Sequence, residues 1–290
     1  MTGRQLRDAL AGDAPVVAPG VYDALTAALV AEAGFAAAYL SGASIAYTRL
    51  GRPDIGLVAM TEVADVIGRI TERVPDLPLI VDADTGFGNA LNVQRTFALF
   101  ERNGAAAIQL EDQQMPKRCG HLAGKKLVSQ AEMVGKIKAA TDARRDVGTV
   151  LVARTDAIAV EGFEPALDRA AAYAEAGADV LFVEAPQSHD QMKAVGERFD
   201  VPLLANMVEG GKTPVRAAAD LAGLGFKLVI FPGALVRAQT MVARELLAGL
   251  ARDGSTAAFA NRMLDFKGLQ DLLGTEAILE EARQYDEDSQ

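Results

Sequence analysis

The sequence predicts an α/β fold, a closed (β/α)8 barrel of the TIM type, from three observations. Eight short apolar runs are spread along the 290 residues, and helix-period segments lie between them. The runs are almost continuously apolar, which indicates burial on both faces and parallel pairing. A sequence pattern in which a helix end is followed by glycine, a small residue and a buried strand occurs four times, as in AEAGADVLFVEA at 174–185. Eight consecutive strand–helix units are typical of a closed barrel.

The expected strands follow one another along most of the chain. They cover residues 16–18, 37–41, 79–84, 107–112, 150–156, 180–184, 203–206 and 228–231. The spacing of Ala and Leu predicts helices over residues 22–33, 93–103, 131–143, 165–176 and 215–224. Several of these helices are followed by glycine, which readily adopts the left-handed conformation of a helix C-cap.

We expect one barrel domain over residues 1–290, in which residues 255–290 form a helical extension. A doubly wound open sheet is the main alternative, but no glycine-rich dinucleotide fingerprint follows the first strand. Helical pattern over 239–252, 257–273 and 275–285 exceeds what a barrel needs, so packing on a neighbouring subunit is expected, and the tail 287–290 is expected to be disordered. The two long connections, 42–78 and 113–149, are expected to be functional loops.

Composition argues against several classes of function. The 39 acidic residues outnumber the 29 basic ones, and the net charge of −10 opposes binding to nucleic acid or anionic membranes. No apolar stretch approaches the roughly 20 residues of a membrane span, and the start of the chain lacks the apolar core of a secretory signal. A single cysteine, Cys119, excludes an internal disulfide. We therefore expect a cytoplasmic protein that acts on a small molecule.

Polar residues gather where the expected strands end. In a parallel barrel the active site lies at the carboxyl ends of the strands. The expected ends carry Tyr39, Ser41, Gly42, Asp82, Asp84, Glu111, Asp112, Arg154, Asp156, Glu184 and Asn206. The expected strands begin with apolar residues instead, so the sequence predicts a catalytic site at one end of the barrel.

Three of these carboxylates suggest a metal site. Asp82 and Asp84 are two residues apart on an expected strand, so both side chains should point to one face, with Glu111 level on the next strand. Acids this close repel one another unless a cation joins them, and hard oxygen ligands favour Mg²⁺ or Mn²⁺ over zinc. The alternative is a structural network in which the acids pair with Arg154 or Lys117.

The segment PKRCGH, residues 116–121, places the lone cysteine among cations. Lys117, Arg118 and His121 surround Cys119 in the sequence, and neighbouring cations lower the pKa of a thiol. Such a thiol can donate or accept a proton near neutral pH. A loop cysteine without a role is the alternative, and a covalent nucleophile lacks an evident Cys–His–Asn partner set.

Two arginines are candidate clamps for a substrate carboxylate, because guanidinium binds carboxylates in bidentate fashion. Arg154 ends an expected strand, and Arg237 lies in the first helical turn after the last strand. For Arg237, a solvated helix charge is an equally good interpretation from the spacing alone.

Together, these motifs resemble the isocitrate lyase/phosphoenolpyruvate mutase superfamily. The matching segments are YLSGAS, GRPDIG, VDADTGFGN, QLEDQ, PKRCGH, VARTDA, VEAP and ANMVEGGKTP, and the resemblance runs from Pro19 to about Phe266. The Lys-Arg-Cys-Gly-His loop is similar to the lyase branch, which includes 2-methylisocitrate lyase and 2,3-dimethylmalate lyase.

The resemblance implies a barrel whose last helix is exchanged between the subunits of a homo-oligomer, a tetramer or a dimer. It implies Mg²⁺, or Mn²⁺, held by Asp82 and Asp84, with Asp54 and Glu111 around them. The implied substrate contacts are Ser41, Gly42, Ala43, Gly120, His121, Arg154, Glu184, Asn206 and Arg237. It implies that Tyr39 helps to take the hydroxyl proton and that Cys119 protonates the departing carbanion, and we place Lys117 and His121 in the same catalytic group.

The chain departs from the methylisocitrate enzymes at three points. Ala43 stands where a glycine is usual, Leu122, Ala123 and Gly124 replace Arg-Pro-Asn, and Phe266 or Lys267 occupies the place of an arginine. The missing arginine bears on whether a third substrate carboxylate is bound.

The expected function is a Mg²⁺-dependent carbon–carbon lyase. Its retro-aldol reaction would cleave a 2-hydroxy di- or tricarboxylate, of the 2-methylisocitrate or 2-alkylmalate type, to pyruvate or glyoxylate plus a carboxylic acid. The alternatives are an oxaloacetate hydrolase or decarboxylase, and a non-catalytic metabolite-binding barrel.

Overall fold

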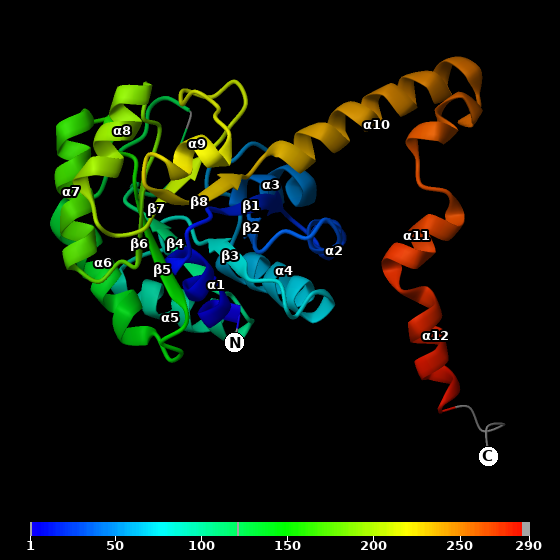
Figure 1. Cartoon of the computed structure of the whole chain (residues 1–290), viewed down its shortest axis with the longest axis horizontal. Helices are drawn as coiled ribbons and strands as arrows, with labels where there is room; N and C mark the ends of the chain where they lie inside the picture. Colours follow the sequence, from blue (N-terminus) through cyan, green and yellow to red (C-terminus); the bar gives the residue numbers. More distant parts are fainter. Residues whose placement is uncertain (1, 121, 286–290) are drawn as a thin grey trace. The chain divides into compact units, whose positions relative to one another are not determined.

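The computed structural model describes residues 2–120 and 122–285 and contains a closed barrel of eight parallel strands (Figure 1). The strands are β1 (Val16–Val21), β2 (Ala38–Leu40), β3 (Leu79–Asp82), β4 (Ala107–Glu111), β5 (Val150–Thr155), β6 (Val180–Val183), β7 (Leu203–Asn206) and β8 (Phe226–Phe231). Each strand pairs with the next one along the chain, and β8 closes the barrel on β1. The predicted (β/α)8 fold is therefore confirmed.

Helices cover the outside of the barrel. They are α2 (Ala24–Glu32), α4 (Met60–Arg73), α5 (Ala90–Arg102), α6 (Gln130–Ala143), α7 (Phe163–Glu175), α8 (His189–Arg198) and α9 (Ala218–Ala222). Short turns of helix lie between some of these elements, as α3 (Gly42–Ile45), η1 (Ala46–Leu50) and η2 (Ala157–Ala159). The prediction that residues 42–78 form one long loop is wrong, because α4 occupies much of the segment and buries Val63, Val66, Ile67 and Ile70 at helical spacing.

Helix α1 (Thr2–Ala11) packs against the residues that fill the inside of the barrel, and the strand and helix patterns did not predict it. Leu6 and Leu10 are buried in one cluster with inward-facing strand residues such as Val16 and Val150. Arg7 donates hydrogen bonds to the carbonyl oxygens of Gly148 (3.0 Å) and Thr149 (2.9 Å), at the amino end of β5. Apolar packing therefore covers the amino ends of the strands. A substrate-binding site is expected at the opposite, carboxyl ends.

The chain divides into two compact units, Met1–Val236 and Arg237–Gln290. The first unit is the barrel, and the expected extension from residue 255 remains a prediction. The second unit holds most of α10 (Ala234–Asp253), followed by η3 (Ala257–Arg262), α11 (Phe266–Leu273) and α12 (Thr275–Arg283). The expected helical segments 239–252 and 275–285 overlap α10 and α12, whereas the expected segment 257–273 is interrupted at 263–265 between η3 and α11. Residues 287–290, expected to be disordered, lie outside the described residues.

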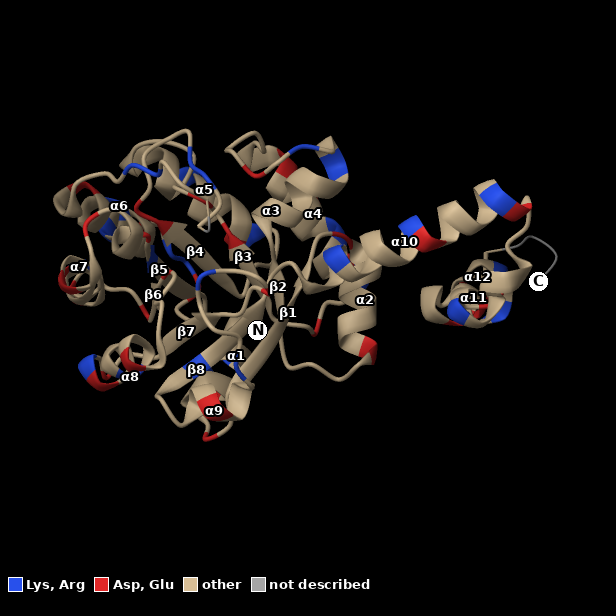
Figure 2. Ribbon diagram, turned by 90° about the horizontal axis from the view of Figure 1, so that it is seen from above, with Lys and Arg blue, Asp and Glu red and all other residues tan. Residues whose placement is uncertain are grey.

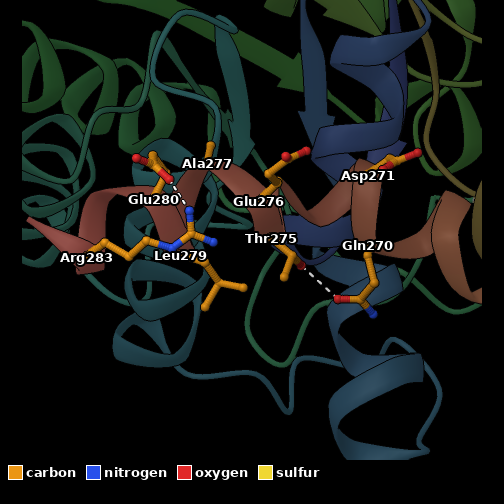
Figure 3. A pocket seen from close by; sticks show the side chains of 9 residues that line it. Gln270, Asp271, Thr275, Glu276, Ala277, Leu279, Glu280 and Arg283 are labelled. Carbon is orange, nitrogen blue, oxygen red and sulfur yellow. Dashed lines mark hydrogen bonds and ion pairs between the residues drawn. The ribbon is translucent and has the colours of Figure 1, made fainter.

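An open pocket of about 790 Å³ lies along α11 and α12 (Figure 3). Thr275 donates a hydrogen bond of 2.7 Å to Gln270 across it, and Arg283 pairs with Glu280. None of the described residues of η3, α11 or α12 is buried. Across the described parts of the chain, no helix is both long and apolar enough to cross a membrane.

Two helical glycines provide a matched test of the packing. A Cβ atom added at Gly196 in α8 would lie 1.7 Å from the carbonyl oxygen of Leu224, whereas one added at Gly135 in α6 meets nothing within 4 Å. Because the backbone at Leu224 must move, we expect Gly196→Ala to lower the free energy of unfolding by about 1–3 kcal/mol. Gly135→Ala should raise it by about 0.5–1 kcal/mol, because alanine favours the helix.

Urea unfolding followed by circular dichroism measures both changes. Equal effects of the two substitutions would contradict the close approach of α8 to the segment before β8.

Candidate active site

Buried charged side chains collect at the carboxyl ends of the strands. In the view of Figure 2, acidic and basic segments gather around β3, β4 and β5. We call nine of these residues the charge cluster: Asp54, Asp82, Asp84, Glu111, Asp156, Glu184, Lys117, Lys125 and Arg154. Each is at most 8 % exposed, so six carboxyl groups and three cations share a site of low polarity. Such burial disfavours charge unless the groups are paired.

Asp82 and Asp84 converge through a turn. The prediction that the strand extends to residue 84 is wrong, because β3 ends at Asp82 and Asp84 adopts a left-handed conformation with φ of 48°. The backbone N–H of Asp84 donates to Oδ1 of Asp82 (3.1 Å), which holds the turn. A Cβ atom at Gly42 would lie 3.2 Å from Oδ2 of Asp82 and 3.4 Å from Oδ1 of Asp84. Both carboxylates therefore border the same small space beside Gly42.

Lys117 joins two carboxylates of the charge cluster. Its Nζ lies 2.6 Å from Oδ1 of Asp54 and 2.7 Å from Oδ1 of Asp84. Burial raises the pKa of Asp84 to about 7, with Asp82 and Asp54 adding to the rise and Lys117 opposing it. Burial opposes the charge of Lys117 as well, but the surrounding carboxylates hold its pKa well above the ordinary value. The pairing of acids with Lys117, considered above as the alternative to a metal, is thus present.

The donor set nevertheless fits a divalent cation. Among the described residues, Glu111 Oε1, Asn206 Oδ1 and the hydroxyl oxygen of Thr85, next to Asp84 in the chain, are buried without a hydrogen-bond partner. Asp84 Oδ1 is engaged by Lys117 at 2.7 Å. No group of three or more His, Cys, Asp or Glu side chains within the described ranges could jointly hold an ion. Mg²⁺ commonly binds proteins through one or two carboxylates and keeps several waters, so the pair Asp82 and Asp84 meets its needs.

Arg154 is surrounded by carboxylates. It is the register partner of Glu111 on the neighbouring strand, and its Nε lies 3.4 Å from Oε2 of Glu111 and 2.9 Å from Oδ2 of Asp156. Its Nη2 lies 3.9 Å from Oε2 of Glu184, and the guanidinium stacks over the ring of Phe182 at 4.9 Å. Burial raises the pKa of Glu111 well above its usual range, although Arg154 opposes the rise.

Gln109 links two predicted site residues and was not itself predicted. Tyr39 donates its hydroxyl hydrogen to Oε1 of Gln109 (3.0 Å), and Nε2 of Gln109 donates to Oδ1 of Asp82 (3.2 Å). Burial, with the nearby Asp82 carboxylate, raises the pKa of Tyr39 well above its ordinary value. The geometry weighs against Tyr39 as a base. Gln109 lies two residues before Glu111 on β4, so strand alternation offered a signal for it.

The loop that carries Cys119 closes on the same end of the barrel. The backbone N–H of Cys119 donates to the carbonyl oxygen of Asp54 (3.2 Å), and its side chain is half-buried. The side chain of Gln113 clamps the backbone of Arg118, accepting from its N–H (2.9 Å) and donating to its carbonyl (2.8 Å). A Cβ atom at Gly120 would lie 2.4 Å from Nη2 of Arg154. The backbone of the Cys119 loop thus contacts the charge cluster at Asp54 and Arg154.

The other predicted contacts have different outcomes. Asn206 donates to Oε2 of Glu184 (3.2 Å), so β6 and β7 bring these two together. Ser41 donates its backbone N–H to the carbonyl oxygen of Val21 (3.2 Å), and its side chain caps α3 by accepting from the N–H of Ser44, so the expected anion contact at Ser41, Gly42 and Ala43 remains a prediction. Arg237 is the first residue of the second unit, so its substrate contact remains a prediction. His121 lies outside the described residues.

Comparisons with known proteins identify relatives of this chain. The family model described as phosphoenolpyruvate phosphomutase matches residues 6–251. The chain is 44 % identical over 284 residues to 2,3-dimethylmalate lyase of Eubacterium barkeri, covering 98 % of each chain. It is 47 % identical over 272 residues to 2-methylisocitrate lyase of Aeropyrum pernix, covering 94 % of this chain and 87 % of the relative.

Solved structures are similar as well. Oxaloacetate acetylhydrolase, in complex with the inhibitor 3,3-difluorooxalacetate, has a TM-score of 0.93 and 35 % identity, over 98 % of this chain and 96 % of the other. Phosphonopyruvate hydrolase, in complex with oxalate and Mg²⁺, has a TM-score of 0.88 and 32 % identity, over 98 % and 99 %.

Proposed function

The chain belongs to the phosphoenolpyruvate mutase/isocitrate lyase superfamily, and from that premise we propose that it is a metal-dependent carbon–carbon lyase. Its substrate would be a 2-hydroxy di- or tricarboxylate, cleaved by retro-aldol chemistry to pyruvate or glyoxylate plus a carboxylic acid. Two relatives at 44 % and 47 % identity bear the names of such lyases. The observation that carries the proposal is the charge cluster, whose Asp54 accepts a hydrogen bond from the backbone of the only cysteine of the chain.

Asp82 and Asp84 would hold the metal ion, Mg²⁺ or Mn²⁺, with Asp54 and Glu111 near it. The excess of buried carboxyl groups over cations in the charge cluster supports this assignment, because a divalent ion would offset two of the three surplus negative charges. A bound divalent ion lowers the pKa of a coordinated hydroxyl group and stabilises developing negative charge. The Mg²⁺ and oxalate in phosphonopyruvate hydrolase, at 32 % identity, support the same assignment.

The residues of the chain then divide the work of binding and proton transfer. Arg154, Glu184 and Asn206 would bind the substrate, with Gly120 and the amides of Gly42 and Ala43. When the C2–C3 bond breaks, its electron pair stays on C3 of the departing acid. The thiol of Cys119 would give its proton to that carbon, and the hydroxyl proton would leave the oxygen on C2 as the C2=O bond forms. We place this second proton on a buried carboxylate, directly or through water, and treat Tyr39 as a positioning residue.

Oxaloacetate hydrolysis is the second candidate reaction. The similarity to oxaloacetate acetylhydrolase at 35 % identity favours it, because the same pair of aspartates could serve a hydrated 2-oxo acid. A metabolite-binding barrel without catalysis is the remaining alternative.

We also propose that the protein is a homo-oligomer whose α11 and α12 helices pack on a second copy. The large apolar side chains of this unit are exposed, including Phe266 (82 %), Leu264 and Ile278 (62 % each). The barrel in turn has an apolar groove of about 320 Å³ beside β1, β8 and α2, lined by residues such as Val17 and Phe231. Covering both surfaces would remove apolar area from water. A cytoplasmic location remains a prediction.

A substrate panel with metal control tests the proposed function. We expect the purified chain to cleave 2-methylisocitrate or 2,3-dimethylmalate and to release a 2-oxo acid, detected with a coupled dehydrogenase. A chelator should abolish turnover and added Mg²⁺ should restore it, because Asp82 and Asp84 need the ion. Turnover of oxaloacetate alone would favour the second reaction, and oxalate binding without turnover of any compound would favour the non-catalytic barrel.

Replacing the thiol tests the proton donor. We expect Cys119→Ser to lower kcat by about a hundredfold to ten-thousandfold, because a hydroxyl is a much weaker acid than a thiol, while oxalate binding measured by calorimetry is retained. Leu122→Ala, on the same loop and exposed, is the matched control and should keep normal turnover. Near-normal turnover in Cys119→Ser would refute the assigned role.

A further inference from the structure

A buried lysine in the cysteine loop is the starting point. The side chain of Lys125 is 2 % exposed, and its Nζ lies 2.7 Å from Oδ1 of Asp156, a carboxylate other than those paired with Lys117. The same Nζ donates a hydrogen bond to the carbonyl oxygen of Gly120, the residue after Cys119. Loop lysines ordinarily keep their charge in water, and a buried ion pair adds little stability compared with apolar packing. The burial of Lys125 therefore calls for a reason other than stability.

Asp156 is a rigid anchor for that lysine. Its backbone N–H donates to Oδ1 of Asp112 (2.9 Å), and Asp112 is itself buried and accepts from Thr155 (2.7 Å) and Tyr173 (2.8 Å). Burial alone would raise the pKa of Asp156, but the Arg154 guanidinium and the Lys125 ammonium bring it down to about 2. Asp156 is thus paired with two cations and fixed directly after the end of β5.

One carboxylate holds both the loop and Arg154. Oδ1 of Asp156 accepts from Lys125 and, at 3.0 Å, from Nη2 of Arg154, while its Oδ2 accepts from Nε of Arg154 at 2.9 Å. Gly120 packs so closely that a Cβ atom would lie 2.4 Å from Nη2 of Arg154 and 2.8 Å from Oε1 of Glu184. The position of the loop and the orientation of the guanidinium therefore depend on each other.

We propose that Lys125 and Asp156 form a latch that holds the Cys119 loop closed against the barrel and orients Arg154. Both are positioning residues, since they act through the carbonyl of Gly120 and through the guanidinium of Arg154. The effect of these two residues on catalysis rests on the proposed function, because a closed loop would bring the thiol to the substrate. The contacts of the latch lie within the protein, so the position of the loop can be tested without any substrate.

The single cysteine of the chain makes the loop's position measurable. Alkylation of Cys119 by iodoacetamide reports only this loop, because the chain has no other thiol. We expect Lys125→Met to speed alkylation about tenfold, the effect of losing a hydrogen bond to a charged group. Loss of a nearby cation would by itself raise the pKa of the thiol and slow the reaction, so an increase must come from opening.

Two controls separate the latch from other effects. Lys126→Met makes the same chemical change at the adjacent, exposed lysine and should leave the rate unchanged. Val195→Ala removes apolar atoms from a buried site in α8 and should lower the melting temperature without speeding alkylation. A rate in Lys125→Met equal to that of the wild type, or matched by Val195→Ala at equal loss of stability, would overturn the latch.

A second variant keeps the test decisive if Lys125→Met does not fold. Asp156→Asn keeps the volume and an acceptor for Arg154 but loses the charge that holds Lys125. Compared at the pH plateau where the thiol is fully ionised, its alkylation should also be about tenfold faster than wild type. An unchanged plateau rate would count against the latch.

Measuring turnover together with alkylation distinguishes a failure of the latch from a failure of the proposed reaction. In an active enzyme, Lys125→Met should lower kcat by about tenfold whereas Lys126→Met should not. A chain that turns over no substrate but alkylates faster in Lys125→Met would retain the latch and lose the proposed reaction. Normal turnover and an unchanged alkylation rate in Lys125→Met would overturn the latch and retain the proposed reaction.

Discussion

The excess of buried negative charge at the carboxyl ends of the strands is the constraint on which the rest of this structure depends. Six carboxyl groups of the charge cluster share three cations, and none of the nine is more than 8 % exposed. Isolated charges in such surroundings are costly, so each carboxylate needs a partner. Lys117 serves Asp54 and Asp84, and Arg154 serves Glu111 and Asp156. Because Lys117 comes from the cysteine loop, ion pairing also determines where Cys119 lies.

The scaffold makes this concentration of charge tolerable. Apolar strands, the outer helices and the packing of α1 supply two buried hydrophobic clusters that carry no charge. These clusters stabilise the barrel independently of the site, so the carboxyl end can hold groups that oppose folding. The left-handed conformations of Asp84 and Ala185 lie next to that end, where local strain is typically tolerated for function.

Much of the fold could be predicted from the sequence because the relevant signals are local. Buried parallel strands are continuous apolar runs, and each of the eight expected runs overlaps an observed strand. What was missed depends on tertiary structure. The turn at Asp84 is held by a hydrogen bond to Asp82, and the links of Gln109 and Lys125 join residues that are far apart along the chain. Helix α1 buries Leu6 and Leu10 at helical spacing, so a local signal for it is present in the sequence.

The most direct test of the account is an anomalous diffraction map from crystals grown with Mn²⁺ and oxalate, since Mn²⁺ favours the same oxygen ligands as Mg²⁺. The account predicts one Mn²⁺ peak bound by the carboxylates of Asp82 and Asp84 beside Gly42, with Lys117 still paired to Asp54. An ordered site without a peak there, in which Asp82 and Asp84 remain engaged only by protein groups while oxalate binds elsewhere, would contradict it.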